Sequence, residues 1–274
     1  MGSRGTAAAR HGPDVIRGTL PRLPSGSVPE SDSTARGGPQ PGVLDRRRPT
    51  RALAIYAHPD DPEVGCGGTL ARWIDEGCEA AMVVVCGGDK GSSDPGADPG
   101  ALVVRRAEEV RRAAAVLGVT EVVLLGIPDG DVEDTAALRS ALVGLVRTWK
   151  PEVVLCPDPT AELFGRSYWN HRDHRVVGRA VLDAVAPAAA SPHYFPDQGP
   201  PHHVDAVYLS GTLEPDLWVD IGPGLEAKAA AIACHESQVG ETDEWLRTAV
   251  LERAQDAGRA VGVAHAEAFR TLVL

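Results

Sequence analysis

Short apolar runs alternate with helical patterns through most of the chain, and this order constrains the fold more than any other feature. The apolar runs are rich in Val, Leu and Ile, as in strands that are buried on both faces. They are Ala52–Ala57, Ala80–Cys86, Glu121–Leu125, Glu152–Cys156 and Ala206–Leu209. The helical patterns between them are Gly68–Glu76, Ala101–Leu117, Thr135–Trp149 and His174–Val185. The alternation predicts a single α/β, Rossmann-like domain, whose mainly parallel sheet carries helices on both faces.

The N-terminal part of the chain differs in composition from the rest. Residues 1–50 are rich in Gly, Pro, Ser and Arg and carry almost no periodic apolar pattern, which is typical of disorder. No apolar run follows the arginines at 46–48, so we do not expect a secretion signal. The sequence predicts a disordered extension over residues 1–50 and one folded domain over residues 51–274.

Charge and cysteine usage narrow the class of partner. The net charge of −11 argues against a broad nucleic-acid interface. No apolar segment approaches the roughly 18–20 residues that span a bilayer, so we expect no membrane insertion. The five cysteines are scattered and never spaced C-x-x-C, which argues against disulfides or a thiolate zinc site and fits the cytoplasm. The sequence gives no indication of an oligomeric state.

Polar clusters follow the first and the fourth predicted strand. Residues 58–61 (His-Pro-Asp-Asp) come directly after the first strand. The fourth strand leads through Pro157-Asp158-Pro159 to residues 170–174 (Asn-His-Arg-Asp-His). Open parallel sheets place their sites at the carboxyl ends of strands. We therefore expect the two clusters to meet over one edge of the sheet.

Together the two clusters contain the side chains of a catalytic zinc site. Such a site takes three ligands from His and carboxylate and leaves a position for water. A remaining carboxylate could accept the proton of that water, and a remaining imidazole could protonate the leaving group. The candidates are His58, Asp60 and Asp61 in the first cluster and His171, Asp173 and His174 in the second. The set suits amide or ester hydrolysis, but residue types alone do not assign the roles.

Each cluster taken alone also has a purely structural interpretation. Pro and Asp both favour turns, so the first cluster fits a simple turn. Asp173 fits a helix start, where its carboxylate stabilises the N-terminal dipole. We favour the metal site because both clusters follow predicted strands.

Further motifs follow in a fixed order through residues 51–240. The first cluster continues with Glu63 and Gly65–Leu70, and the second has the form His-x-Asp-His. The other motifs are Arg106 with Glu109, Leu125–Gly130, Pro151–Val154, Lys228 and His235–Gln238. This ordered set resembles the PIG-L-type (LmbE-like) deacetylases, which hydrolyse the N-acetyl amide of N-acetylglucosamine units with the help of zinc.

The resemblance implies a role for each site residue. His58, Asp61 and His174 match the ligands of one Zn²⁺ per chain. Asp60 matches the general base, and His171 matches the histidine that stabilises the tetrahedral intermediate and protonates the departing amine. Adjacent residues at an extended strand end point to opposite sides, which would separate Asp60 from Asp61.

The resemblance also implies contacts with the substrate. Arg106 and Asp129 match positions that contact the sugar, although Arg106 also fits a surface salt bridge with Glu109. Trp169 could stack on a sugar or an aglycone, or could simply anchor its loop. Some relatives have a tyrosine at this position that assists the oxyanion. Because Trp donates only through its indole N–H, the choice between Tyr168 and Trp169 for that role is open.

The implied substrate is an N-acetylglucosaminyl group on a small-molecule glycoside. The compact catalytic region favours a secondary-metabolite substrate, such as a teicoplanin-type glycopeptide pseudoaglycone. A deacetylase of a thiol-cofactor precursor, of the mycothiol or bacillithiol type, and a non-catalytic sugar-binding relative are the alternatives. A dinucleotide-binding module is disfavoured, because Gly65–Gly68 comes too late after the first strand and lacks the G-x-G-x-x-G spacing.

Overall fold

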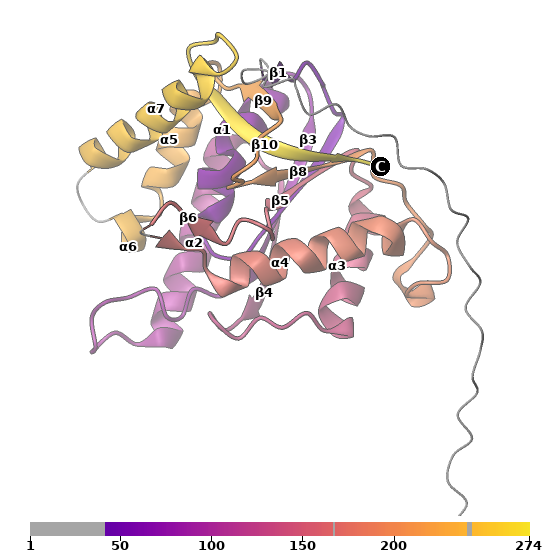
Figure 1. Cartoon of the computed structure of the whole chain (residues 1–274). Helices are drawn as coiled ribbons and strands as arrows, with labels where there is room; N and C mark the ends of the chain where they lie inside the picture. Colours follow the sequence, from indigo (N-terminus) through magenta and orange to yellow (C-terminus); the bar gives the residue numbers. More distant parts are fainter. Residues whose placement is uncertain (1–41, 167, 240–242) are drawn as a thin grey trace, which may run out of the picture. The chain divides into compact units, whose positions relative to one another are not determined.

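The computed structural model describes residues 42–166, 168–239 and 243–274. Its centre is an eight-stranded sheet in the order β1-β9-β10-β8-β5-β2-β3-β4 (Figure 1). The strands are β1 (Val43–Leu44), β2 (Arg51–Tyr56), β3 (Glu79–Cys86), β4 (Glu121–Ile127), β5 (Val153–Pro157), β8 (Ala206–Ser210), β9 (Leu217–Asp220) and β10 (Ala266–Val273). Within this sheet β10 runs antiparallel to both of its neighbours, β8 and β9, and the other pairs are parallel. The predicted mainly parallel sheet is confirmed.

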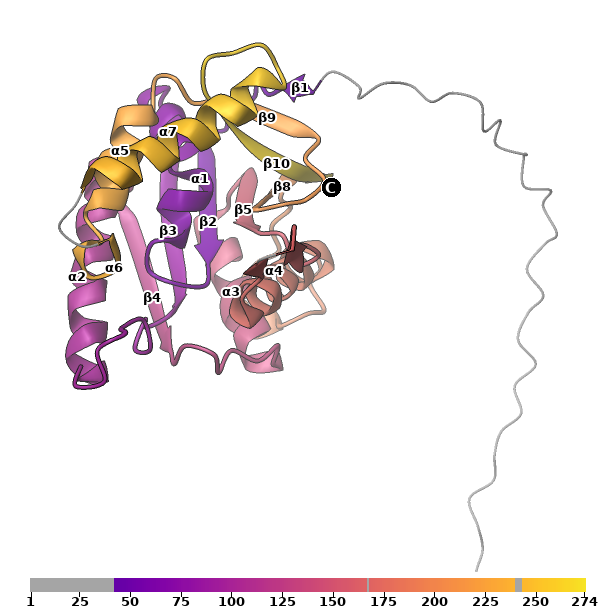
Figure 2. The same cartoon turned by 60° about the vertical axis from the view of Figure 1, so that its left-hand side comes forward.

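Helices cover both faces of the sheet, as predicted (Figure 2). One face carries α1 (Asp61–Asp75), α2 (Pro99–Leu117), α5 (Leu225–Ala233) and α7 (Asp243–Arg259), with the short α6 (Glu236–Val239) after α5. The other face carries α3 (Ala136–Trp149), α4 (Arg172–Asp183) and the π-helix η1 (Ala184–Ala189). A short hairpin of β6 (Leu163–Phe164) and β7 (Tyr168–Trp169) precedes α4, and a 3₁₀ turn, η2 (Pro196–Gln198), follows η1.

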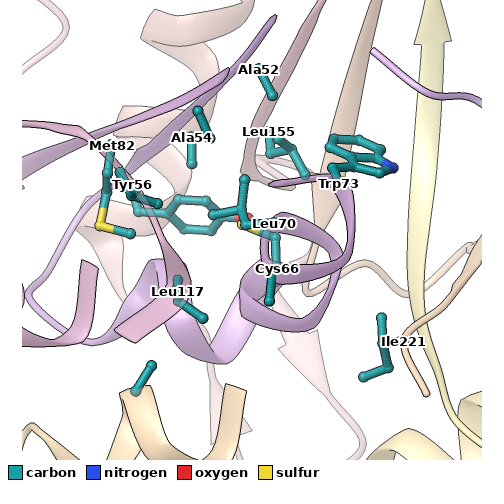
Figure 3. Close-up of a cluster of buried hydrophobic side chains, with 14 of the residues drawn as sticks. Ala52, Ala54, Tyr56, Cys66, Leu70, Trp73, Met82, Leu117, Leu155 and Ile221 are labelled. Atoms are coloured by element: carbon teal, nitrogen blue, oxygen red, sulfur yellow. The ribbon is translucent and has the colours of Figure 1, made fainter. Parts of the chain in front are cut away.

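The two cores follow from the alternation of side chains along the strands. In β2, Ala54 and Tyr56 face the α1 side, whereas Leu53 and Ile55 face the α3 side. Figure 3 shows the α1 side, where Tyr56 lies among side chains from α1 and the neighbouring strands. Burying one such large apolar side chain stabilises the fold by about 1.5–3 kcal/mol. Burial on both faces explains why the strands read as continuous apolar runs.

Helix α1 begins at Asp61, well before the predicted start at Gly68. The glycines near its start lie inside the helix because it packs very closely on its neighbours. A Cβ at Gly65 would lie 2.8 Å from the Tyr56 ring, and one at Gly68 would lie 2.8 Å from Ile221 Cβ. The missing side chains therefore let α1 lie directly on the sheet, with its N-terminus at the carboxyl end of β2.

The domain extends upstream of the predicted boundary at Arg51. Val43 and Leu44 form β1, which pairs with β9, and Tyr208 Oη donates a 2.7 Å hydrogen bond to Asp45. Residues 1–41 of the predicted extension lie outside the described residues. In the part of the chain that the structure describes, no helix is long and apolar enough to span a membrane.

Candidate active site

Three predicted ligands meet at the carboxyl edge of the sheet. His58 follows β2, Asp61 is the first residue of α1, and His174 lies in the first turns of α4. His58 Nδ1 lies 3.1 Å from His174 Nε2 and 3.3 Å from Asp61 Oδ2. His174 Nε2 lies 3.1 Å from the same Asp61 oxygen. Two imidazole nitrogens and one carboxylate oxygen thus form a nearly equilateral triangle.

The triangle fits a tetrahedral metal site. Zinc–nitrogen and zinc–oxygen bonds of about 2.0–2.1 Å place neighbouring ligand atoms roughly 3.3 Å apart. The outer nitrogens of both rings have acceptors: His174 Nδ1 lies 3.0 Å from Asn170 Oδ1, and His58 Nε2 lies 3.3 Å from Asp173 Oδ2. Protons on these outer nitrogens leave the inner lone pairs free for a metal, an arrangement typical of metal-binding histidines.

Within the described residues, two other groups around His58 could also hold a metal, and both suit it less well. In one, burial raises the pKa of the Cys86 thiol, and the Asp129 carboxylate accepts the backbone N–H of Gly88. The other uses His171 and Asp173, but Asp173 is fully buried and already accepts a 2.6 Å hydrogen bond from the Gly130 N–H. Asp173 thus supports His58 from behind.

Asp60 lies outside the triangle and has an unusual backbone conformation. Its φ of 102° lies in the left-handed region, which costs a non-glycine residue about 1–3 kcal/mol. The expected alternation of an extended strand end is therefore wrong. This left-handed turn separates Asp60 from Asp61, because the helix already begins at Asp61. The turn is held by Arg106 Nη2, which donates a 2.7 Å hydrogen bond to the Pro59 carbonyl.

The electrostatics distinguish the two aspartates. Burial raises the pKa of Asp60, and the charge of Asp61 adds to this effect, so the pKa reaches about 7 despite the nearby Arg106. Burial also acts to raise the pKa of Asp61, but His174 and His58 hold it well below its usual range. Asp61 is therefore a permanent anion inside the triangle, whereas Asp60 can exchange a proton near neutral pH.

The same charges act on His58. Burial alone would lower the pKa of His58, but the hydrogen bond and charge of Asp61, with Asp129 and Asp173, raise it to about 9. The metal-free cluster at neutral pH therefore holds a proton on His58, which a metal ion has to displace.

His171 lies at the open side of the cluster. It is the N-cap of α4, and its Nδ1 accepts a 3.2 Å hydrogen bond from the Asp173 N–H. Its ring packs edge-on against His58, with 4.7 Å between the centroids. Burial lowers the pKa of His171, and the neighbouring His58 charge lowers it further. The neutral ring carries its proton on Nε2 and can donate it to a group bound in the site.

The structure places two predicted sugar-contacting residues beneath the site. Arg106 is 3% exposed, and its guanidinium contacts the Pro59 and Gly88 carbonyls and lies 3.6 Å from Asp60. The alternative salt bridge of Arg106 with Glu109 does not form, because Glu109 pairs with Arg105 at 3.1 Å. Asp129 is 7% exposed and accepts the Gly88 N–H at 2.9 Å. Both residues therefore hold loops around the cluster.

The two aromatic residues of β7 face different surroundings. Trp169 is 59% exposed and stacks with Arg175, whose Cζ lies 5.0 Å from the ring centroid. Tyr168 instead lines a cavity that begins at Asp61 and His174. Of the two, only Tyr168 shares this cavity with residues of the triangle.

Two buried groups near the site have partners that the sequence did not indicate. Asn170 orients His174, and its spacing of four residues before that histidine on a helix start was an available signal. Glu63 and His235 are both fully buried, with Glu63 Oε2 lying 3.3 Å from His235 Nε2 behind Asp60. These two residues are far apart in the sequence, so no local pattern indicates their pairing.

Comparisons with known proteins find relatives that are named as deacetylases. The profile of the PIG-L family, described as GlcNAc-PI de-N-acetylase, matches residues 53–185. The diacetylchitobiose deacetylase of Thermococcus kodakarensis is 33% identical over 230 residues, which cover 80% of this chain and 82% of that protein. The 1D-myo-inositol 2-acetamido-2-deoxy-alpha-D-glucopyranoside deacetylase 2 of Saccharopolyspora erythraea is 31% identical, over 57% of this chain and 63% of that protein.

A solved structure supports the same relationship. The N,N'-diacetylchitobiose deacetylase from Pyrococcus horikoshii superposes with a TM-score of 0.75 at 28% identity, covering 82% of this chain and 84% of the other. The fold, the cluster and these relatives together define the class of metal-dependent N-deacetylases. The chain belongs to the PIG-L family.

Proposed function

We propose that the protein is a zinc-dependent N-deacetylase that removes the acetyl group from an N-acetylglucosaminyl unit of a small-molecule glycoside. One Zn²⁺ per chain would be held by His58, Asp61 and His174. The observation that carries the proposal is the triangle of 3.1–3.3 Å between their ligand atoms, with Asp60 and His171 beside it. The names of the relatives support an acetamide on a sugar as the substrate.

The residues around the triangle divide the proton transfers between them. When bound, a zinc ion polarises the amide carbonyl and the attacking water. Asp60 accepts a proton from that water, and its pKa of about 7 suits a base that works near neutral pH. His171 donates its Nε2 proton to the departing nitrogen. The amide C–N bond breaks, a C–O bond to the water oxygen forms, and the products are acetate and the free amine.

The relatives also favour some aglycones over others. The diacetylchitobiose deacetylase relatives favour a short sugar chain as the remainder of the substrate. A thiol-cofactor precursor is the second candidate, because the relative from Saccharopolyspora erythraea is named for an inositol glycoside. The glycopeptide pseudoaglycone stays a prediction from the sequence alone. A reducing, cytoplasmic setting fits the five cysteines, all of which are free thiols.

A screen of acetylated glucosaminides tests the proposal. Diacetylchitobiose, N-acetylglucosaminyl-inositol and a glycopeptide pseudoaglycone would each be incubated with zinc-loaded protein, and mass spectrometry would follow the loss of acetyl. We expect at least one substrate to release acetate, and a chelator to stop the release. Unchanged substrates in the presence of stoichiometric zinc, or release that a chelator does not affect, would contradict it.

A further inference from the structure

A cavity of about 720 Å³ begins at Asp61 and His174 and extends away from them under α7. Ligand cavities typically measure roughly 300–1,000 Å³. The methyl of an acetyl group needs little more than the ~30 Å³ of one water molecule. The cavity is therefore much larger than acetate requires, although it opens directly onto two of the proposed metal ligands.

The cavity lies on the side of the cluster formed by Asp61 and His174, both of which line it. Asp60 and His171 are not among the described residues that line it. In the proposed reaction His171 protonates the departing nitrogen, so the sugar lies on the His171 side of the scissile carbonyl. The other substituent of the carbonyl carbon, the acyl chain, then points toward the cavity.

The walls of the cavity suit a hydrocarbon chain. Its far end lies between α5, α7 and β10, and α7 packs directly on α5 and β10 (Figure 2). Small and aliphatic side chains line this part: Ile221, Ile232, Ala249, Val250, Ala254, Ala257, Ala266 and Ala268. Three charged groups lie at this end of the cavity: Lys228 and Glu267 form a 2.5 Å ion pair with each other, and Arg253 of α7 is exposed to solvent. The wall is therefore mostly apolar, with one charged side chain at its exposed side.

We propose that this cavity binds the acyl group of the substrate, and that the protein hydrolyses N-acylglucosaminides whose saturated chains are longer than acetyl. This inference rests on the proposed function. The bond changes are those of the acetyl reaction: the amide C–N bond breaks, the water oxygen binds the carbonyl carbon, and the amine takes up a proton. The products are a fatty carboxylate and the free amino sugar, and no co-reactant is needed.

A chain-length series tests the proposal directly. Methyl glucosaminides with N-acetyl, N-butanoyl, N-hexanoyl and N-octanoyl groups would be compared with zinc-loaded protein. Each buried methylene should raise kcat/KM by about fourfold, at least as far as hexanoyl. Turnover of acetyl with a falling kcat/KM for longer chains would overturn the inference and leave the proposed function intact. No chelator-sensitive turnover of any member would instead contradict the proposed function.

Variants that fill the cavity provide the structural test. Ala254→Leu and Ala257→Leu place a larger side chain in its wall. Each should lower the ratio of hexanoyl to acetyl kcat/KM by at least about tenfold. The matched control is Ala260→Leu at an exposed position just after α7, which should leave the ratio unchanged. Because Ala257 is only half-buried, its variant carries the test if Ala254→Leu does not fold. A ratio unchanged in both cavity variants would overturn the proposal.

Binding of the product gives a readout that is independent of turnover. Calorimetry should show that octanoate binds the zinc-loaded protein at least tenfold more tightly than acetate, and that Ala257→Leu removes this preference. Octyl glucoside, whose chain stands for an aglycone, serves as the competing ligand. The proposal is overturned if octanoate binds no more tightly than acetate, while octyl glucoside binds and Ala257→Leu weakens the binding of octyl glucoside. The cavity would then hold the aglycone.

Discussion

The two chain segments that build the site differ in length and in the way they are held. After β2, the chain reaches Asp61 through a tight turn that leads directly into α1. Arg106 donates a hydrogen bond to the Pro59 carbonyl in this turn. After β5, the chain passes through the β6-β7 hairpin before it reaches His171 and His174. This second segment carries exposed aromatic side chains. In the proposed mechanism, the short turn therefore carries the base and two of the metal ligands, while the longer segment carries the third ligand, the acid and the aromatic side chains near the site.

The largest effect should come from removing His174, the proposed ligand that lies on the longer segment. His174→Ala leaves the two proposed ligands of the first segment. We expect the affinity for zinc to fall more than about a hundredfold, which exceeds the loss typical of removing a residue that only hydrogen-bonds to a ligand. Metal analysis after dialysis measures this. Arg175→Ala, at the next position, is the control and should keep its zinc. Stoichiometric zinc in His174→Ala would show that the second segment does not complete the site.

A second variant separates the two aspartates of the short turn. Asp60→Asn removes the base but no proposed ligand, so the protein should retain zinc and lose at least about a hundredfold in kcat. Steady-state acetate release and metal content from the same preparation provide the comparison. Near-normal turnover would remove Asp60 from the proton path, and loss of zinc would make it a ligand.

The pH dependence of zinc binding tests the electrostatics of the turn. Because the pKa of His58 is raised to about 9 in the metal-free protein, zinc must displace its proton. The apparent affinity should rise by up to about tenfold per pH unit between pH 7 and 9 and then level off.

The stability of the metal-free fold should change in the opposite direction. A raised folded-state pKa stabilises the protein fully below the unfolded value of about 6.5, and this contribution is lost as the pH rises through 9. Competition with a fluorescent chelator and thermal unfolding measure the two effects. A zinc affinity independent of pH in this window would contradict the predicted proton on His58.

The smallest effect distinguishes the two aromatic residues of the hairpin. Tyr168 lines the cavity at the cluster, so Tyr168→Phe should lower kcat/KM by up to about tenfold, the value of one hydrogen bond. Trp169→Phe should change it by less than about threefold, because that ring stacks on Arg175 at the surface. A reversed order of the two effects would show that Trp169 faces the substrate.

Local sequence patterns predicted the elements whose formation depends on neighbouring residues in the chain. The five predicted strands correspond to β2, β3, β4, β5 and β8, because strands buried on both faces need continuous apolar runs. β10 was not predicted, since it pairs antiparallel between β8 and β9 and this placement depends on distant segments. The start of α1 was missed because its glycines reflect close packing on Tyr56 and Ile221, which a local pattern does not reveal.

The sequence likewise predicted some features of the site and not others. The order of motifs predicted which histidines and aspartates come together, because strand ends of a parallel sheet share one edge. It did not predict the left-handed turn at Asp60, which tertiary contacts of Arg106 support. The buried positions of Arg106 and Asp129 and the cavity under α7 also depend on packing between distant elements.

In the proposed site, three side chains bind one metal ion, and Asp60, which lies between two of them in the sequence, binds none. Crystals of the zinc-loaded protein, measured at the zinc absorption edge, test it most directly. We expect one anomalous peak, bonded to His58 Nδ1, Asp61 Oδ2 and His174 Nε2, with both Asp60 oxygens outside bonding distance. A peak bonded to Asp60 or Asp173, or no peak within reach of His174, would contradict it.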